Sequence, residues 1–315
     1  MGSLATSVAG LIDATFLQSR VGDVLREAPQ RLLAAYPGQI PDTYRENPQA
    51  IPTFLYRCYT LAMTIYLLVP GVTQTFGTSA LPNVTAAYAR GNKRELRSKL
   101  EAVVRVTALF CFPAGVGMAS LSFPLTQLLY GHGESTPIIA RCLFLLGAAS
   151  LPAAMSGPLS SMLQAVGRAD LPVKLLLGAM AIKLGANWVL CGIPELNIQG
   201  AAVGTLLCYL FLTVFQFYCL RRAAGVPLSI GQVFLRPLAC ALLCGAGARL
   251  AWGILERIFP AGRWGEALAV LGATAFGAAV YTAALLLLRG INKSDLQSLP
   301  MGQKIAKMLE KQGWI

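Results

Sequence analysis

Long apolar runs separated by short polar connections dominate the chain. A hydrocarbon core of ~30 Å needs ~20 apolar residues per helix, and at that length the pattern predicts eight membrane-spanning helices. The runs do not alternate polar and apolar residues, as the strands of a membrane barrel would. The predicted spans are about 2–19, 55–80, 103–124, 140–165, 173–193, 199–220, 233–255 and 267–288. The sequence therefore predicts an all-α integral membrane protein.

One polar connection is unusually basic. The stretch AYARGNKRELRSKL, residues 87–100, holds five Lys and Arg residues, and it stands between residues 58–89 and 106–133, neither of which contains an Asp, Glu, Lys or Arg. Short loops rich in Lys and Arg stay on the cytoplasmic side of a membrane. We therefore expect residues 87–100 to face the cytoplasm.

The remaining connections agree with this orientation. With eight spans, residues 166–174, residues 221–236 and the tail from Arg289 share the side of residues 87–100, and the four segments together hold fifteen basic residues. The short loops on the opposite side hold three, which are Arg141, Arg257 and Arg263. The charges thus predict a multi-pass protein of the cytoplasmic membrane with its C-terminus inside the cell.

Composition supports the membrane class and argues against nucleic acid as a partner. Only 13% of the 315 residues are charged, against roughly 25% in soluble domains, and the mean hydropathy is +0.59. A net charge of +12 is compatible with phosphate binding. However, the charges form short islands without interleaved aromatic residues, so the expected partner is the lipid bilayer.

Residues that carry enzymatic or metal chemistry are scarce. The one histidine, His132, lies in a Gly-rich loop, and the eight cysteines lie inside or at the ends of apolar runs without CxxC spacing. Such cysteines are typical of buried, unpaired thiols. The sequence contains no phosphate-binding loop. We expect no enzyme activity, no metal and no cofactor.

Polar residues at bilayer depth form the candidate site. Asp13 lies inside the first predicted span, Lys183 interrupts the fifth, and Asn187 follows one helical turn later on the same face. Arg57 lies at the outer mouth of the second span. Polar groups at this depth usually face a cavity or a partner, so these four residues are candidates for contact with an anionic or sugar-bearing substrate or a coupling ion. The structural alternative is an ion pair or hydrogen bond between helices, and interface anchoring in the case of Arg57.

Prolines and glycines predict local geometry. Prolines kink membrane helices, which predicts bends at Pro70, Pro113, Pro152 and Pro158. Gly200 and Gly204 are four residues apart and predict the close approach of a neighbouring helix. Residues 298–312 read as a short amphipathic helix, although a polar tail without structure is an alternative.

Several stretches resemble the C-terminal half of the multidrug/oligosaccharidyl-lipid/polysaccharide flippase superfamily, and within it the branch of stage V sporulation protein B and lipid II flippase-like exporters. The stretches are SVAGLIDATFLQSRV (7–21), SALPNVTAAYARGNKRELRSKLEAVVRVTALFCFPAGVGMASLSFPLTQLLYG (79–131), LQAVGRADLPVKLLLGAMAIKLGANWVL (163–190) and NIQGAAVGTLLCYLF (197–211). Members of this superfamily have fourteen helices in two six-helix bundles plus two further helices.

The resemblance implies a division of the chain. Residues 1–222 would form the second six-helix bundle, residues 223–290 the two additional helices, and residues 291–315 a cytoplasmic amphipathic tail. Asp13, in LID, and Lys183 and Asn187, in KLGAN, would lie in spans that line a central cavity.

The resemblance also implies a function. The protein would export a lipid-linked saccharide, a precursor of cell wall or polysaccharide, by alternating access and as part of a longer protein whose N-terminal half is missing here. The alternatives are a cation-coupled multidrug exporter of the same fold and a membrane fragment or assembly subunit that does not transport.

Overall fold

The chain folds into long antiparallel and parallel α-helices. The computed structural model describes residues 2–227, 230–259 and 262–287. The helices are α1 (Gly2–Glu27), α2 (Pro29–Ala35), α3 (Asp42–Glu46), the 3-10 helix η1 (Pro48–Ala50), α4 (Ile51–Tyr66), α5 (Leu68–Ala89), α6 (Lys93–Ser120), α7 (Ser122–Tyr130), α8 (Thr136–Ala165), α9 (Asp170–Cys191), α10 (Ile198–Ala224), α11 (Ile230–Ile258) and α12 (Arg263–Leu287). The amphipathic helix predicted at 298–312 lies outside the described residues.

Seven segments within the described residues are long and apolar enough to cross a membrane: the continuous η1–α4–α5 segment, α6, α8, α9, α10, α11 from Phe234, and α12. They coincide with the second to eighth predicted spans. The first predicted span falls in α1, which is 26 residues long but is not among the seven. The prediction of an all-α membrane fold is confirmed.

Helices extend beyond the predicted spans because hydropathy marks only the part at bilayer depth. The third span was expected to begin near residue 103, whereas α6 begins at Lys93. Asn92 caps this helix, its side-chain oxygen accepting a hydrogen bond from the Glu95 amide at 3.2 Å. Gly91, at φ +68°, turns the chain just before the cap. The basic stretch 87–100 thus comprises the end of α5, the tight turn at residues 90–92 and the first two turns of α6.

One long helical segment lacks a backbone hydrogen bond beside a proline. The helical segment that begins at Ile51 is interrupted at Leu67, between α4 and α5. Pro70 has no amide hydrogen to donate to the carbonyl of Tyr66, which removes one backbone hydrogen bond at that point. By contrast, α6 continues through Pro113 and α8 through Pro152 and Pro158 as single helices.

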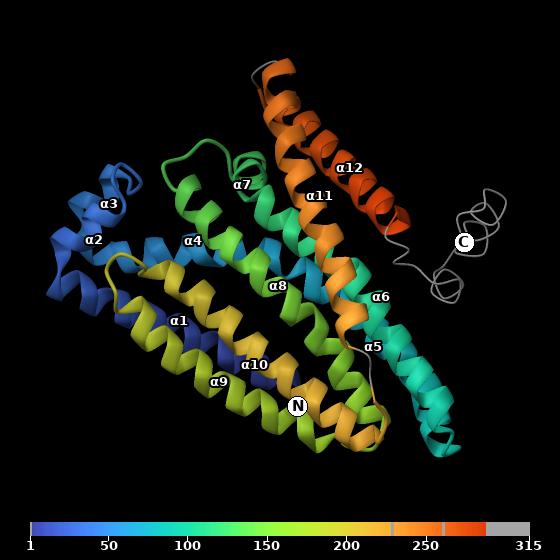
Figure 1. The fold of residues 1–315 in the computed structure, drawn as a ribbon. Helices are drawn as coiled ribbons and strands as arrows, with labels where there is room; N and C mark the ends of the chain where they lie inside the picture. The colour runs from blue at the N-terminus through green and yellow to red at the C-terminus, as the bar shows by residue number, and fades with distance from the viewer. Residues whose placement is uncertain (1, 228–229, 260–261, 288–315) are drawn as a thin grey trace.

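The connections gather at two opposite ends of the bundle (Figure 1). The α5–α6 turn, the α8–α9 turn and the C-terminal end of α10 lie at the lower right in this view. The α1–α2 corner and the α9–α10 loop lie at the left, and the α7–α8 loop, the end of α11 and the start of α12 lie toward the top. The basic connections that the structure describes, at residues 87–100, at residues 166–174 and at the end of α10, share the first end, whereas the basic tail from Arg289 lies outside the described residues.

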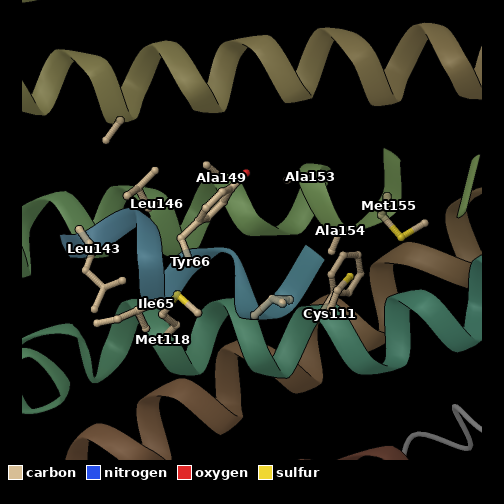
Figure 2. Packing of buried hydrophobic residues seen from close by; sticks show 14 of the residues in the cluster. Ile65, Tyr66, Cys111, Met118, Leu143, Leu146, Ala149, Ala153, Ala154 and Met155 are labelled. Atoms are coloured by element: carbon tan, nitrogen blue, oxygen red, sulfur yellow. The ribbon is translucent and has the colours of Figure 1, made fainter. Parts of the chain in front are cut away.

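The core is centred on α8. In the most apolar stretch of α8, 67% of the residues are buried inside the protein, whereas in that of α9 only 11% are buried. Figure 2 shows the contact region, where the Tyr66 ring of α4 reaches Leu146 and Ala149 of α8, and Met118 of α6 lies near Ile65 of α4 and Leu143 of α8. Small residues on α8 let both helices approach closely, so α8 is the central helix and α9 lies at the periphery.

The connection between α1 and α4 is folded rather than extended. Leu32, Tyr36 and Ile40 in this connection are almost completely buried and belong to the main core cluster. The short helices α2, α3 and η1 therefore cap one end of the bundle and fix the position of α1 relative to α4.

The α11–α12 hairpin packs against α6. The Tyr281 hydroxyl of α12 donates to the Leu109 carbonyl of α6 at 2.9 Å. At the other end of the hairpin, His132 Nε2 lies 2.7 Å from Glu266 Oε1, which links the α7–α8 loop to α12. All eight cysteines are unpaired and seven of them are buried, which confirms their interpretation as structural thiols.

Candidate functional site

The candidate residues lie on or beside α1, which contacts both α4 and α9. Phe16 of α1 and Trp188 of α9 have ring centroids 5.6 Å apart. The Arg20 guanidinium lies 4.5 Å from the same indole ring, and its Nε donates to the Trp188 carbonyl at 3.2 Å. On its other side, α1 brings Gly22 against Pro52 of α4. These contacts fix how far along α4 and α9 each residue of α1 lies.

The backbone places Asp13 near the level of Lys183. Arg20 also lies beside Gly192, so α1 and α9 run in the same direction. Asp13 precedes Phe16 by three residues and Lys183 precedes Trp188 by five, which are rises of about 4.5 and 7.5 Å along the two helices. Lys183 is half-buried and has an interaction partner. The side chain of Asp13 lies outside the described part of the chain.

Asn187 is completely buried and faces α10. A Cβ at Gly204 would collide with its amide oxygen, and a Cβ at Gly200 would lie 2.7 Å from the backbone of Leu190. The close helix contact predicted at the two glycines is confirmed. Neither amide atom of Asn187 has a hydrogen-bond partner among the described residues. A buried, unsatisfied amide costs about 1–3 kcal/mol, so this side chain destabilises the contact that it occupies.

Arg57 is exposed on α4, five residues after Pro52. Five residues correspond to about 7.5 Å along the helix. Arg57 therefore lies about that far into the bundle from the end that α2 and α3 cap. Arg57 and Lys183 therefore lie on the two helices that α1 contacts, and Arg20 contributes a third cation from α1 itself.

A row of threonines continues from Arg57 along α4 and α5. We call this the threonine stripe, and its members are Thr60, Thr64, Thr75, Thr78 and Thr85. Residues three, four, seven or eleven apart lie on one face of a helix, and four of the five are exposed while Thr60 is half-buried. The segment that carries the stripe is the least apolar of the seven spanning segments.

Each hydroxyl of the stripe donates to a carbonyl of its own helix. For example, Thr64 Oγ1 donates to the Thr60 carbonyl at 3.0 Å and Thr75 Oγ1 to the Val72 carbonyl at 2.7 Å. The hydroxyl proton is thereby used, while the oxygen lone pairs remain able to accept hydrogen bonds. A polar ligand rich in hydroxyl groups matches such a row of acceptors, and the cations at its end match an anion.

The threonine stripe was not recognised in the sequence, although its signal was present. The run 58–89 has no charged residue and was interpreted only as apolar. The spacing of Thr60, Thr64, Thr75, Thr78 and Thr85 fits one helical face. Averaged hydropathy conceals a narrow polar face when the rest of the helix is apolar.

No group of three or more His, Cys, Asp or Glu side chains suited to holding a metal occurs in the part of the chain that the structure describes. The site described above consists of cations, one buried amide and hydroxyl groups. Its chemistry is that of binding through charge and hydrogen bonds.

Comparison with known proteins identifies the family. The model of the lipid II flippase MurJ family matches residues 56–270. The chain belongs to this family. Among curated proteins, the MurJ-family chain is 24% identical to lipid II flippase MurJ of Bacillus subtilis (strain 168) over 238 residues, and 25% identical to its stage V sporulation protein B over 242 residues. It is 23% identical to the uncharacterized membrane protein YabM of the same organism over 240 residues.

These matches cover 74–76% of the MurJ-family chain but only 43–44% of the relatives. The chain thus spans less than half the length of the curated relatives that it matches. A solved structure of lipid II flippase MurJ, in an inward closed conformation, superposes with a TM-score of 0.55 at 20% identity, covering 74% of this chain and 47% of that one. The fold is therefore that of one part of a MurJ-type flippase.

Proposed function

We propose that the chain is the C-terminal bundle, with two additional helices, of a flippase that exports a lipid-linked saccharide across the cytoplasmic membrane. Membership of the MurJ family supports the general class. The observation that favours a saccharide substrate is the threonine stripe, which offers a row of hydrogen-bond acceptors along α4 and α5 with Arg57 at one end. A phosphate and sugar headgroup needs both kinds of partner.

In this proposal the polar face borders a water-filled path. An exposed arginine at bilayer depth is costly against lipid, whereas water or a second bundle can solvate it. Asp13 and Lys183 would belong to the same face and form a pair that opens or closes with the state of the transporter, whereas Asn187 is sealed against Gly204 of α10 and does not border the path. Residues 1–222 would be the bundle, 223–290 the additional helices and 291–315 a cytoplasmic tail.

The other half of the path would come from a first bundle. The relatives extend well beyond the matched region, with 43–44% of their length covered. We infer that this chain works by alternating access together with such a bundle. Movement of each charge through the membrane potential would supply ~2.3 kcal/mol per ~100 mV.

Depletion of the chain from its native cell is the test of this function. We expect lipid-linked saccharide to accumulate on the cytoplasmic side, measured as precursor protected from a modifying enzyme added outside. The intact chain should restore export, whereas Lys183→Ala should fail to restore it at unchanged protein level.

Lys174→Ala is the matched control on the same helix. Lys174 is exposed and pairs with Asp170 at 3.0 Å, and exposed pairs contribute little to stability. It should restore export fully. Unchanged precursor distribution after depletion would overturn the proposed function, and normal export by Lys183→Ala would remove that residue from the site.

A further inference from the structure

An apolar groove lies on the side of the bundle away from α1. It has a volume of about 970 Å³ and is lined by residues of α6, α8, α10 and α11. Its floor is aromatic, because Phe234 of α11 lies 5.8 Å from Phe112 of α6 and 6.3 Å from Phe217 of α10, measured between ring centroids. In its wall, Thr213 Oγ1 of α10 donates to the Pro152 carbonyl of α8 at 2.6 Å. The groove is thus built by four helices and has almost no polar side chain along its length.

One rim of the groove is open to the surroundings. Leu210, Val214 and Tyr218 follow one another along α10 and are 49%, 56% and 59% exposed. All three line the groove. In a membrane protein such a face lies against lipid, so a lipid chain can enter the groove sideways without crossing the bundle.

The groove ends at two arginines. Arg221 and Arg222 lie in the last turn of α10, line the groove and are exposed. Neither makes an ion pair with a residue that the structure describes. Gly225, with φ +61°, ends the helix by donating its amide hydrogen to the Arg221 carbonyl at 3.1 Å. The two guanidinium groups therefore offer unneutralised positive charge at one end of an apolar channel.

The exposed rim of the groove, from Leu210 to Arg221, matches one leaflet in length. Arg221 follows Leu210 by eleven residues, which is about 16 Å along the helix axis. Half of a ~30 Å hydrocarbon core is ~15 Å. A diacyl lipid whose phosphate rests at the arginines would therefore have its chain ends beside Leu210. A polyprenyl chain long enough to pass into the opposite leaflet would extend beyond this rim.

We propose that this groove is a binding site for one anionic glycerophospholipid. An acyl chain lies between α8 and α10, and the phosphate group accepts hydrogen bonds from Arg221 and Arg222. Guanidinium groups suit phosphate because they donate two parallel hydrogen bonds. The leaflet depends on the orientation proposed above and would be the cytoplasmic one, but the site itself does not depend on the transport function.

Lipid binding to the purified full chain tests the proposal. The chain in detergent is titrated with phosphatidylglycerol or with phosphatidylcholine of the same acyl chains, and bound lipid is counted by native mass spectrometry. We expect one tightly held phosphatidylglycerol and weaker phosphatidylcholine. Arg221→Gln with Arg222→Gln should lower the affinity for phosphatidylglycerol about 25-fold, since each arginine near an anionic headgroup contributes a factor of roughly five.

Two further variants separate the site from general charge and from misfolding. Arg236→Gln removes an exposed arginine of α11 that does not line the groove, and it should leave binding unchanged. Val214→Trp, at an exposed position, should fill the groove and reduce binding of both lipids while the thermal midpoint stays the same. Equal retention of both lipids, or an Arg236→Gln effect as large as that of the double variant, would overturn the proposal. Displacement of phosphatidylglycerol by an equal amount of a polyprenyl diphosphate would overturn the choice of occupant.

Discussion

At the scale of single residues, glycines decide where helices touch. A Cβ at Gly115 would lie 2.5 Å from the Ser150 hydroxyl of α8, and a Cβ at Gly147 would lie 2.8 Å from the Ala119 backbone of α6. Gly200 allows the same closeness between α10 and α9. Without a hydrophobic driving force between helices in lipid, such close contacts provide much of the packing energy.

Gly200→Ala should therefore destabilise the chain in detergent by about 1–3 kcal/mol, the usual cost of overpacking. The obstacle is the backbone of Leu190 and Cys191, which cannot move aside as a side chain can. The thermal midpoint of the purified protein measures the effect. Gly185→Ala is the matched control in α9, because nothing lies within 4 Å of its Cβ, and it should leave the midpoint unchanged or raise it. Equal midpoints for both variants would contradict the assigned contact.

At the scale of elements, the α4–α5 segment differs from the other spanning helices. It combines a missing backbone hydrogen bond at Pro70 with a polar face, whereas α8 has its hydroxyls turned into the core, as at Ser150 and Ser156. Threonines bonded to their own helix are tolerated in lipid, so the stripe by itself does not establish contact with water. Arg57, at one end of the stripe, favours water over lipid as the surroundings, because an exposed arginine is costly against lipid.

Water access to the stripe is measurable with cysteine labelling. Thr64→Cys and Thr78→Cys should react with a membrane-impermeant maleimide in intact membranes, because we place them in an aqueous path. Cys219, the one native cysteine that is not buried, is first replaced by serine. Thr282→Cys is the control, since Thr282 is an exposed threonine of α12 whose hydroxyl bonds to its own helix at 2.8 Å. Labelling of Thr282→Cys alone would show that the stripe faces lipid.

At the scale of the whole molecule, the distribution of charge and the arrangement of helices agree. The basic stretch 87–100 and the α8–α9 turn, which holds Arg168 and is followed by Lys174 near the start of α9, lie at the same end of the bundle (Figure 1). Helices that cross in alternating directions place every second connection on one side, and basic connections remain inside the cell.

Reporter fusions should reveal this orientation. A protein that fluoresces only in the cytoplasm, joined after Asn92, should give signal, and the same reporter joined after Glu195 in the α9–α10 loop should not. Alkaline phosphatase, which is active only outside, should give the reverse pattern at the two positions. Phosphatase activity at Asn92 would contradict the orientation and, with it, the leaflet assigned to the bound lipid.

The pattern of apolar runs was sufficient to predict the fold class and seven of the eight expected spans, because seven described segments are long and apolar enough to cross a membrane and the first predicted span, in α1, is not among them. These properties depend on local composition, because every backbone group in lipid must be satisfied within its own helix. Even the close contact at Gly200 and Gly204 was visible, since it needs only two small residues one turn apart.

The neighbours of each polar residue were decided only by the tertiary structure. Asn187 shares a helical face with Lys183, yet it is sealed against Gly204, because α10 covers that end of α9. Likewise, the groove at Arg221 and Arg222 exists only where four helices from distant parts of the chain meet. Spacing along one helix determines which residues share a face, whereas the partner of that face depends on how all the helices pack together.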